Sequence, residues 1–224
     1  MDLKNNYRYF HRSFKTLYTG IPLTVIGAAV VFGKFFRRYV HVENVFTAMM
    51  VAGVLLILFF LVSFPRDGEF DRGISVKIRD IRAASEEKIT ALEHTPHFME
   101  NYLAEGFVYG EGTHELKRGM DGVFRTDVYC ATQFIITLKR LYIYSMRFSM
   151  LTGETEITFE HVDFADLVSA RIKEELFPLT YNGEQGAIKR AFFTVETKEK
   201  EYAFPSHNDA LADSMASKIM LRNE

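Results

Sequence analysis

The sequence predicts an α+β protein in which a two-helix transmembrane hairpin precedes an antiparallel β domain that ends in a C-terminal helix. The hairpin is predicted by two apolar stretches, 17–36 and 45–64, each about 20 residues long. In helical form a stretch of this length spans the roughly 30 Å hydrocarbon core of a bilayer. The β domain is predicted by short β-branched and aromatic runs that alternate with turn residues after position 107.

The apolar stretches have two other readings. A buried core helix can also be apolar all round, but the run from Val51 to Val62 has no polar face, and the second stretch is longer than a typical core helix. A cleaved signal peptide is the other reading of the first stretch. The sixteen-residue aromatic lead and the second span that follows at once argue against cleavage.

Basic residues predict the orientation of the hairpin. Eight Lys or Arg flank the spans on the side of the two termini, whereas three, Lys34 among them, lie in the connecting loop and oppose this signal. The positive-inside rule then places both termini in the cytoplasm, as an integral protein of the inner or plasma membrane. The single Cys130 fits a reducing compartment. The residues expected at the membrane interface are Arg8, Arg12, Lys15, Arg37, Arg38 and Arg66.

Four segments follow along the chain. Residues 1–16 form a juxtamembrane segment of alternating aromatic and basic side chains, which suits either a helix in the headgroup layer or a simple anchor. Residues 17–64 form the hairpin, 65–106 a linker with an amphipathic helix, and 107–224 the β domain. The domain is acidic, because residues 65–224 hold 27 acids against 20 Lys or Arg.

The segment between the hairpin and the β domain is predicted to be mainly helical. Pro65 ends the second span, and a charged linker follows over 66–73. Apolar residues then recur with a period of 3.6 from Ile74 to His94, which predicts an amphipathic helix that Pro96 ends. We expect one or two further helical turns at 98–104.

The strands of the domain are predicted from composition and turns. A hairpin joins Thr132–Leu138 to Leu141–Phe148 across Lys139 and Arg140. Further strand candidates are 107–109, 123–131, 156–160, 167–172, 190–196 and 201–204, with turns at Gly153, Asn182–Gly183 and 197–200. Ser206 and Asp209 have the spacing of a capping box, which opens a final helix. That helix is expected to carry Leu211, Met215 and Ile219 on one face.

Three runs carry a resemblance to a known family. They are TQFIITLKRLYIYSMRF at 132–148, HVDFADLVSARI at 161–172, and AFFTVETKEKEYAFPSHNDALADSMASKI at 191–219. Over residues 107–222 the chain resembles the pleckstrin-homology-like (PH-like) fold, in its GRAM and bacterial membrane-attached forms. The resemblance implies an antiparallel β-barrel or sandwich capped by a C-terminal helix, and it implies binding of lipid headgroups or peptide partners.

The cations nearest to a headgroup-binding or partner-binding site are Lys117, Arg118, Arg125, Lys139 and Arg140. A phosphate site needs several such side chains to converge. Here acidic residues lie among the first three cations, and the acidic balance of the domain opposes attraction to an anionic membrane. A protein partner is therefore favoured over a lipid.

Catalytic motifs are weak in this sequence. His94 and His97, with Glu93 and Glu100, suit zinc by residue type, but a proline separates the two histidines and no third ligand is marked. Cys130 lies in a predicted strand, where a small buried hydrophobe is the ordinary reading. We therefore expect no enzyme activity, no cofactor and no metal.

The sequence thus favours a membrane-anchored, non-enzymatic interaction or scaffolding module. Its expected partners are the lipid bilayer and a membrane protein, or a second copy through small residues of the spans, with no nucleic acid involved. The alternative is an accessory or regulatory subunit of a transporter or channel, in which the hairpin makes the contact. A membrane hydrolase with its site in the soluble domain is a third reading.

Overall fold

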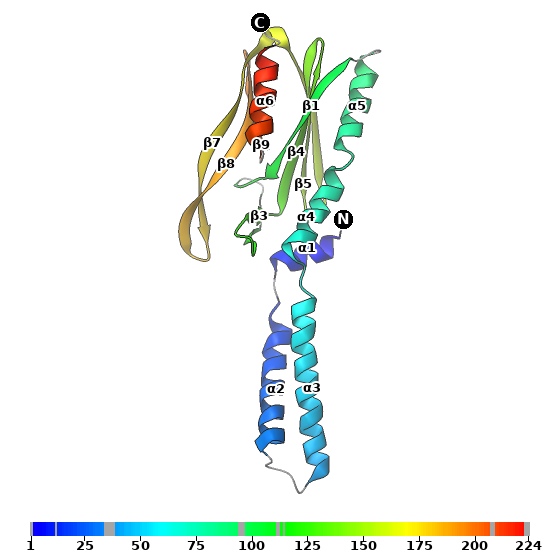
Figure 1. Cartoon of the computed structure of the whole chain (residues 1–224), viewed down its shortest axis with the longest axis vertical. Coiled ribbons are helices and arrows are strands. Elements are labelled where there is room, and N and C mark those ends of the chain that lie inside the picture. The colour runs from blue at the N-terminus through cyan, green and yellow to red at the C-terminus, as the bar shows by residue number, and fades with distance from the viewer. Residues whose placement is uncertain are drawn as a thin grey trace. The chain divides into compact units, whose positions relative to one another are not determined.

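The computed structural model describes residues 2–11, 13–33, 39–93, 97–110, 113, 115–206 and 209–221. Contacts divide the chain into two compact units, which are residues 4–70 and residues 71–224 together with 1–3. The fold is α+β, with antiparallel sheets and a C-terminal helix as predicted (Figure 1). Arg12, Arg37 and Arg38, expected at the membrane interface, lie outside the described residues, as does His94.

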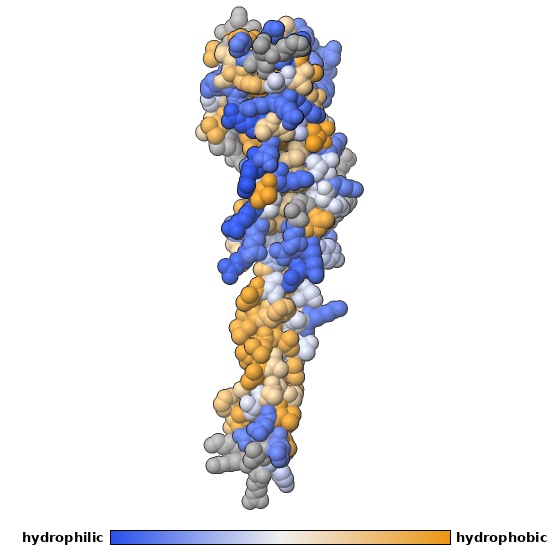
Figure 2. Space-filling view, turned by 90° about the vertical axis from the view of Figure 1, so that its right-hand side faces the viewer, coloured by the Kyte–Doolittle hydropathy of each residue, from blue (hydrophilic) through white to orange (hydrophobic). Residues whose placement is uncertain are grey.

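The first unit contains two long apolar helices, α2 (Lys15–Gly33) and α3 (Val40–Val62). Their apolar windows have a mean hydropathy of 1.6 and 2.8, and 11% of each window is buried. A core helix of a soluble protein would have most of its residues buried. Figure 2 shows hydrophobic residues over most of the visible surface of the middle of this pair, with hydrophilic residues toward its ends. By length and composition both helices can cross a membrane, which supports membrane association.

Glycines let α2 and α3 approach each other closely. A Cβ added to Gly53 would lie 2.4 Å from Oγ1 of Thr24, and one added to Gly27 would lie 2.7 Å from the backbone nitrogen of Met50. A Cβ added to Gly20 would lie 3.0 Å from the carbonyl oxygen of Gly53. These small residues are therefore occupied by the contact inside the hairpin.

The juxtamembrane segment folds back onto the residues that follow the second span. Helix α1 (Leu3–Phe10) places the buried ring of Tyr9 against Phe70, with ring centroids 4.5 Å apart. The Tyr9 hydroxyl donates to Oδ1 of Asp67 over 2.7 Å, and Nη2 of Arg8 donates to the carbonyl oxygen of Ser63 over 2.9 Å. Arg8 is thus held by protein contacts.

The predicted linker and amphipathic helix are corrected in three places. The charged run after Arg66 is already helical, because α4 extends over Asp67–Ile78. The single helix expected from Ile74 is two helices, since α5 (Ile81–Leu92) starts anew after Asp80. The helical turns expected at 98–104 are wrong, because this stretch belongs to strand β1 (Phe98–Phe107). There Tyr102 and Ala104 are buried two residues apart, which is the period of a strand.

The domain contains three antiparallel sheets. Sheet A has the order β1-β4-β5-β6, with β4 (Val128–Thr137), β5 (Arg140–Ser149) and β6 (Thr155–Asp163). A small hairpin pairs β2 (Leu116–Arg118) with β3 (Phe124–Thr126). Sheet C has the order β7-β8-β9, with β7 (Leu167–Tyr181), β8 (Glu184–Thr197) and β9 (Glu201–Ser206), and α6 (Asp209–Met220) follows. The strands that the structure describes form open sheets. Of the two predicted forms, barrel and sandwich, the closed barrel is therefore not seen among these residues.

Two of the predicted hairpin turns illustrate how the sequence closes the strands. Thr137 Oγ1 accepts hydrogen bonds from the backbone nitrogens of Lys139 and Arg140, which closes the β4–β5 hairpin. Asn182 and Gly183 have φ angles of 52° and 84° between β7 and β8. This pair of positive φ angles matches the tight hairpin turns that Asn-Gly favours.

Sheet A separates two apolar layers. Phe134 and Ile143 point to one face, where Phe193 of β8 and Met215 of α6 complete the main core. On the other face, Ile135 and Tyr142 pack with Ile89 of α5. Figure 1 shows α5 and α6 on opposite sides of this sheet. Two layers of packing on one sheet fix the direction of every strand residue.

The buried side of α6 differs in part from the prediction. Met215 and Ile219 are buried as expected, but Leu211 is 59% exposed. Ala212 and Ala216 complete the buried face in its place. The expected apolar stripe is therefore shifted by one position at its start, where small residues allow α6 to pack closely.

Replacing Gly53 by Ile should weaken the α2–α3 contact, because the new side chain overlaps Thr24. We expect a loss of about 1–3 kcal/mol in the free energy of unfolding, as for overpacked interiors. The control is Gly68→Ala in α4, where an added Cβ has no atom within 4 Å. Far-UV circular dichroism during unfolding in mixed micelles measures both variants. Equal stability of the Gly53 variant and the wild type would contradict the close contact.

Candidate functional site

The five cations expected to bind a headgroup or partner do not form one site. Lys117, Arg118 and Arg125 lie on the β2–β3 hairpin, and Lys139 and Arg140 lie at the β4–β5 turn. These places are at opposite ends of β4, a strand of 10 residues. At about 3.3 Å per residue they are roughly 30 Å apart, so one headgroup cannot bridge them.

Arg125 is buried in a double ion pair. Its side chain is 5% exposed, and its guanidinium binds Asp71 of α4 through Nε and Nη2 at 2.9 and 2.8 Å. It also binds Asp121 through Nη1 and Nη2 at 2.9 and 2.7 Å. Two bidentate pairs fill the donor fork. Arg125 therefore joins α4 to the small hairpin and has no donor directed at a ligand.

The other predicted cations are placed individually. Arg140 pairs with Asp163 at 2.6 Å, and the guanidinium of Arg118 lies 5.7 Å from the ring centre of Phe124. Lys117 is half-buried and Lys139 is exposed. In the first unit, Lys15 at the start of α2 and Arg66 before α4 are exposed. Of the five predicted cations, only Lys139 and Arg140 lie at the β4–β5 turn.

A different feature of sheet A indicates a binding site. The face that carries Phe134 and Ile143 becomes polar along the same strands, where Cys130 and Thr132 of β4 lie opposite Arg147 and Ser145 of β5. Thr132 Oγ1 and Ser145 Oγ are hydrogen-bonded at 2.9 Å, and Cys130 Sγ lies 3.5 Å from Ser145 Oγ. One half of the face is therefore core, and the other half lines a hollow.

This hollow is an apolar lobe of about 260 Å³ between sheet A and strands β8 and β9. Its wall opposite Cys130 and Ser145 consists of Phe192, Ala203, Phe204 and Pro205. Cys130 is buried, as predicted for a small hydrophobe, but it also lines the lobe. Arg147 and Glu156, which are opposite one another in the β5–β6 register, line the lobe as well.

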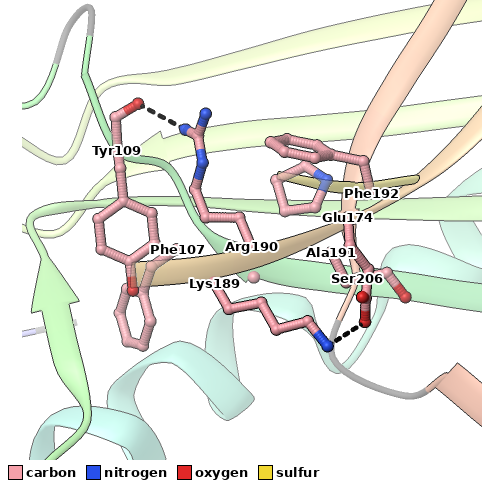
Figure 3. A pocket seen from close by; sticks show the side chains of 10 residues that line it. Phe107, Tyr109, Glu174, Lys189, Arg190, Ala191, Phe192 and Ser206 are labelled. Carbon is pink, nitrogen blue, oxygen red and sulfur yellow. Dashed lines mark hydrogen bonds and ion pairs between the residues drawn. The ribbon is translucent and has the colours of Figure 1, made fainter. Parts of the chain in front are cut away.

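A second hollow, the cationic lobe, shares Phe192 and Pro205 with the first. It has a volume of about 220 Å³ and is lined from β1 by Phe107 and from β8 by Lys189 and Arg190. Figure 3 shows the Arg190 guanidinium turned toward the carbonyl of Tyr109, and the Lys189 ammonium turned toward Glu174. The two lobes together form the inter-sheet cleft. Its size falls within the range of about 300–1,000 Å³ that small-molecule sites occupy.

Arg190 is the most distinctive residue of the cleft. Its side chain is 18% exposed and its guanidinium lies 4.1 Å from the ring centre of Phe177 and 5.0 Å from that of Phe192. Nη1 donates to the carbonyl oxygen of Tyr109 over 3.2 Å, and Nη2 reaches Glu175 only at 3.5 Å. Nε is buried without a hydrogen-bond partner. The protein's own acceptors thus leave this cation incompletely satisfied.

The remaining polar groups of the cationic lobe are paired. Lys189 Nζ lies 2.6 Å from Oε1 of Glu174, so its charge is balanced. The Tyr109 hydroxyl donates to the carbonyl of Phe124 over 2.7 Å, and burial raises the pKa of Tyr109 to about 12. The phenol is therefore neutral at physiological pH. Arg190 is left as the cation that an anionic ligand would meet.

The cleft has the chemistry of a binding site. Among the described residues, no group of three or more His, Cys, Asp or Glu could hold a metal ion. An apolar wall beside an immobilised cation suits a ligand that has both an apolar and an anionic part. The sequence reasoning missed Arg190 and Phe192, because nothing in the run Ile188–Phe193 separates them from other residues of an alternating strand.

Comparison of the chain with protein-family models, with curated proteins and with solved structures finds no match.

The Asp121–Arg125 pair predicts a specific loss of stability in acid. Hydrogen bonds from Arg125 lower the pKa of Asp121 from 3.8 to about 2. A lowered folded-state pKa stabilises the fold above the unfolded-state pKa, and this stabilisation disappears as the pH falls from about 4 to 2. The stability difference between the wild type and Asp121→Asn should therefore be constant above pH 5 and vanish near pH 2.

Urea unfolding of the detergent-solubilised protein at several pH values measures this difference. The control is Asp166→Asn, which removes an exposed partner of Lys198 at 3.4 Å. Exposed pairs of this kind contribute little to stability. A pH-independent difference for the Asp121 variant would contradict the ion pair.

Proposed function

We propose that the protein is a membrane-anchored, non-enzymatic interaction module. The hairpin α2–α3 holds a PH-like domain at the inner surface of the membrane, where the domain recruits or scaffolds a partner. The observation that carries this proposal is the apolar surface of α2 and α3. Only 11% of each apolar window is buried within the protein. In water such a surface is unfavourable, whereas in lipid it is solvated.

The arrangement of the domain supports the PH-like part of the proposal. The β1-β4-β5-β6 sheet faces the β7-β8-β9 sheet across the main core, and α6 contributes Met215 and Ile219 to that core. Two facing antiparallel sheets and a C-terminal helix are compatible with the sandwich form that the resemblance implies. In that family the common role is recognition of a partner or headgroup, which fits a cleft lined for binding.

Charge supports a protein partner over an anionic headgroup for the predicted cations. Arg125 is neutralised by two aspartates, and Arg140 is paired with Asp163. The cations that are left lie at opposite ends of β4, and the soluble part of the chain is acidic. Tethering at the membrane raises the effective concentration of the domain for other membrane proteins, so a weak contact is sufficient.

An accessory subunit of a transporter or channel is the second candidate. Large side chains on the outer surface of the hairpin, such as Phe32 and Phe59 at 76% and 60% exposure, can pack against either lipid or another membrane protein. Gly20, Gly27 and Gly53 are already used between α2 and α3. A contact with a larger subunit would therefore involve these large apolar residues.

Membrane fractionation and tag accessibility test the proposal together. We expect the full-length protein in the membrane fraction after alkaline carbonate washing, because two apolar helices are embedded. Tags at either terminus should be inaccessible to protease in intact cells and accessible after permeabilisation. Recovery in the aqueous fraction, or cleavage of the C-terminal tag outside intact cells, would contradict the proposal. Stoichiometric co-purification of a transport protein from mild detergent would favour the accessory subunit.

A further inference from the structure

Arg125, which is buried, and Arg190, which is partly buried, differ in how completely the protein satisfies their donors. Arg125 binds two carboxylates in bidentate geometry at 2.7 to 2.9 Å. Arg190 has one carbonyl at 3.2 Å, one carboxylate oxygen at 3.5 Å, and a buried Nε without a hydrogen-bond partner. A guanidinium offers five donors and normally finds acceptors for them when it is buried. Nη1 and Nη2 of Arg190 each carry a second N–H, for which an anion in the cleft can supply an acceptor.

The position of Arg190 is fixed before any ligand arrives. The rings of Phe177 and Phe192 lie 4.1 and 5.0 Å from the guanidinium, and the Tyr109 carbonyl holds Nη1. Aromatic contacts of this kind orient a guanidinium without neutralising it. A cation that is already immobilised loses little conformational entropy when it binds an anion.

The apolar lobe begins on the other side of the same residues. Phe192 and Pro205 line both lobes, so the two lobes adjoin at these residues. The far wall of the apolar lobe includes Phe204 and Ala203. The Cys130 thiol and the Ser145 hydroxyl, which line this lobe, already have partners in the cluster of Cys130, Thr132 and Ser145. Their hydrogen bonds therefore do not require a polar group on the ligand.

We propose that the inter-sheet cleft binds a small anionic amphiphile, with its carboxylate or phosphate against Arg190 and its apolar chain in the apolar lobe beside Cys130. Single-chain lipids such as fatty acids and alkyl phosphates have this chemistry. Ligand binding in the cleft goes beyond the proposed function. Only the idea that the bilayer supplies the ligand depends on the proposed function. Failure of ligand binding would leave the membrane anchoring untouched.

Binding of radiolabelled decanoate to the full-length protein in zwitterionic nanodiscs, corrected with empty nanodiscs, tests the proposal. Arg190→Gln should weaken binding roughly 10-fold to 100-fold, as expected for the loss of hydrogen bonds to a charged group. The matched control is Arg171→Gln, which changes an exposed arginine of β7 that lies 3.9 Å from Glu196 and outside the cleft. This control should bind as the wild type does.

Variation of the ligand separates the two halves of the site. Decyl phosphate should bind in the same range as decanoate, whereas decanol and decylamine should bind much more weakly because they lack an anion. Affinity should rise about fourfold with each added methylene until the lobe is filled. Butyrate should therefore bind weakly. Equal binding of decanol and decanoate, or equal binding of butyrate and decanoate, would overturn the proposal.

Cys130 reports where the ligand sits, because it is the single cysteine of the chain and lines the apolar lobe. Bound decanoate should slow its alkylation by N-ethylmaleimide, measured by intact-protein mass spectrometry. Binding that leaves the alkylation rate unchanged would overturn the location.

Wild-type affinity in Arg190→Gln together with a loss of affinity in Arg147→Gln would overturn the assignment of the anion to Arg190. Should Arg190→Gln unfold, Arg190→Lys keeps the charge and should bind with intermediate affinity, while wild-type affinity in that variant would contradict the fork geometry.

Discussion

The constraint on which the rest of the structure depends is the apolar surface of α2 and α3. The two helices contact each other through Gly20, Gly27 and Gly53, and this contact buries only about a tenth of their apolar windows. The unburied remainder has to be solvated by something other than water. A bilayer does this for helices of this length, and the backbone hydrogen bonds inside each helix meet the requirement of the hydrocarbon core.

Inside the domain, one sheet face serves two purposes. Strands β4 and β5 carry Phe134 and Ile143 into the core, and a few residues away they carry Cys130 and Ser145 into the inter-sheet cleft. Arg125 and Arg190 follow the same division. Arg125 is satisfied by Asp71 and Asp121 and holds α4 against the small hairpin, whereas Arg190 is held by aromatic rings with acceptors missing. The acceptors around each guanidinium thus distinguish Arg125, which holds the fold together, from Arg190, which is proposed to face a ligand.

The sequence predicted what depends on local pattern. The β4–β5 hairpin, the Asn182–Gly183 turn and the C-terminal helix follow from strand composition, positive φ and an apolar period, and all are present. The helical turns predicted at 98–104 are wrong, because the strand period there becomes visible only through pairing with β4. The cleft could not be predicted, since Arg190 and Cys130 are 60 positions apart in sequence and line adjoining lobes only after the two sheets face each other. Likewise, nothing local shows that Arg125 would be neutralised by Asp71.

The most direct test of the membrane assignment is the environment of α3 itself. Spin labels placed singly at Val51, Leu55 and Leu58, in a Cys130→Ser background reconstituted into liposomes, report collision with oxygen and with a water-soluble nickel complex. The account predicts high oxygen and low nickel accessibility at all three positions, with an exposed β7 position such as Lys173 showing the reverse. Nickel accessibility at the α3 positions equal to that at Lys173 would contradict it.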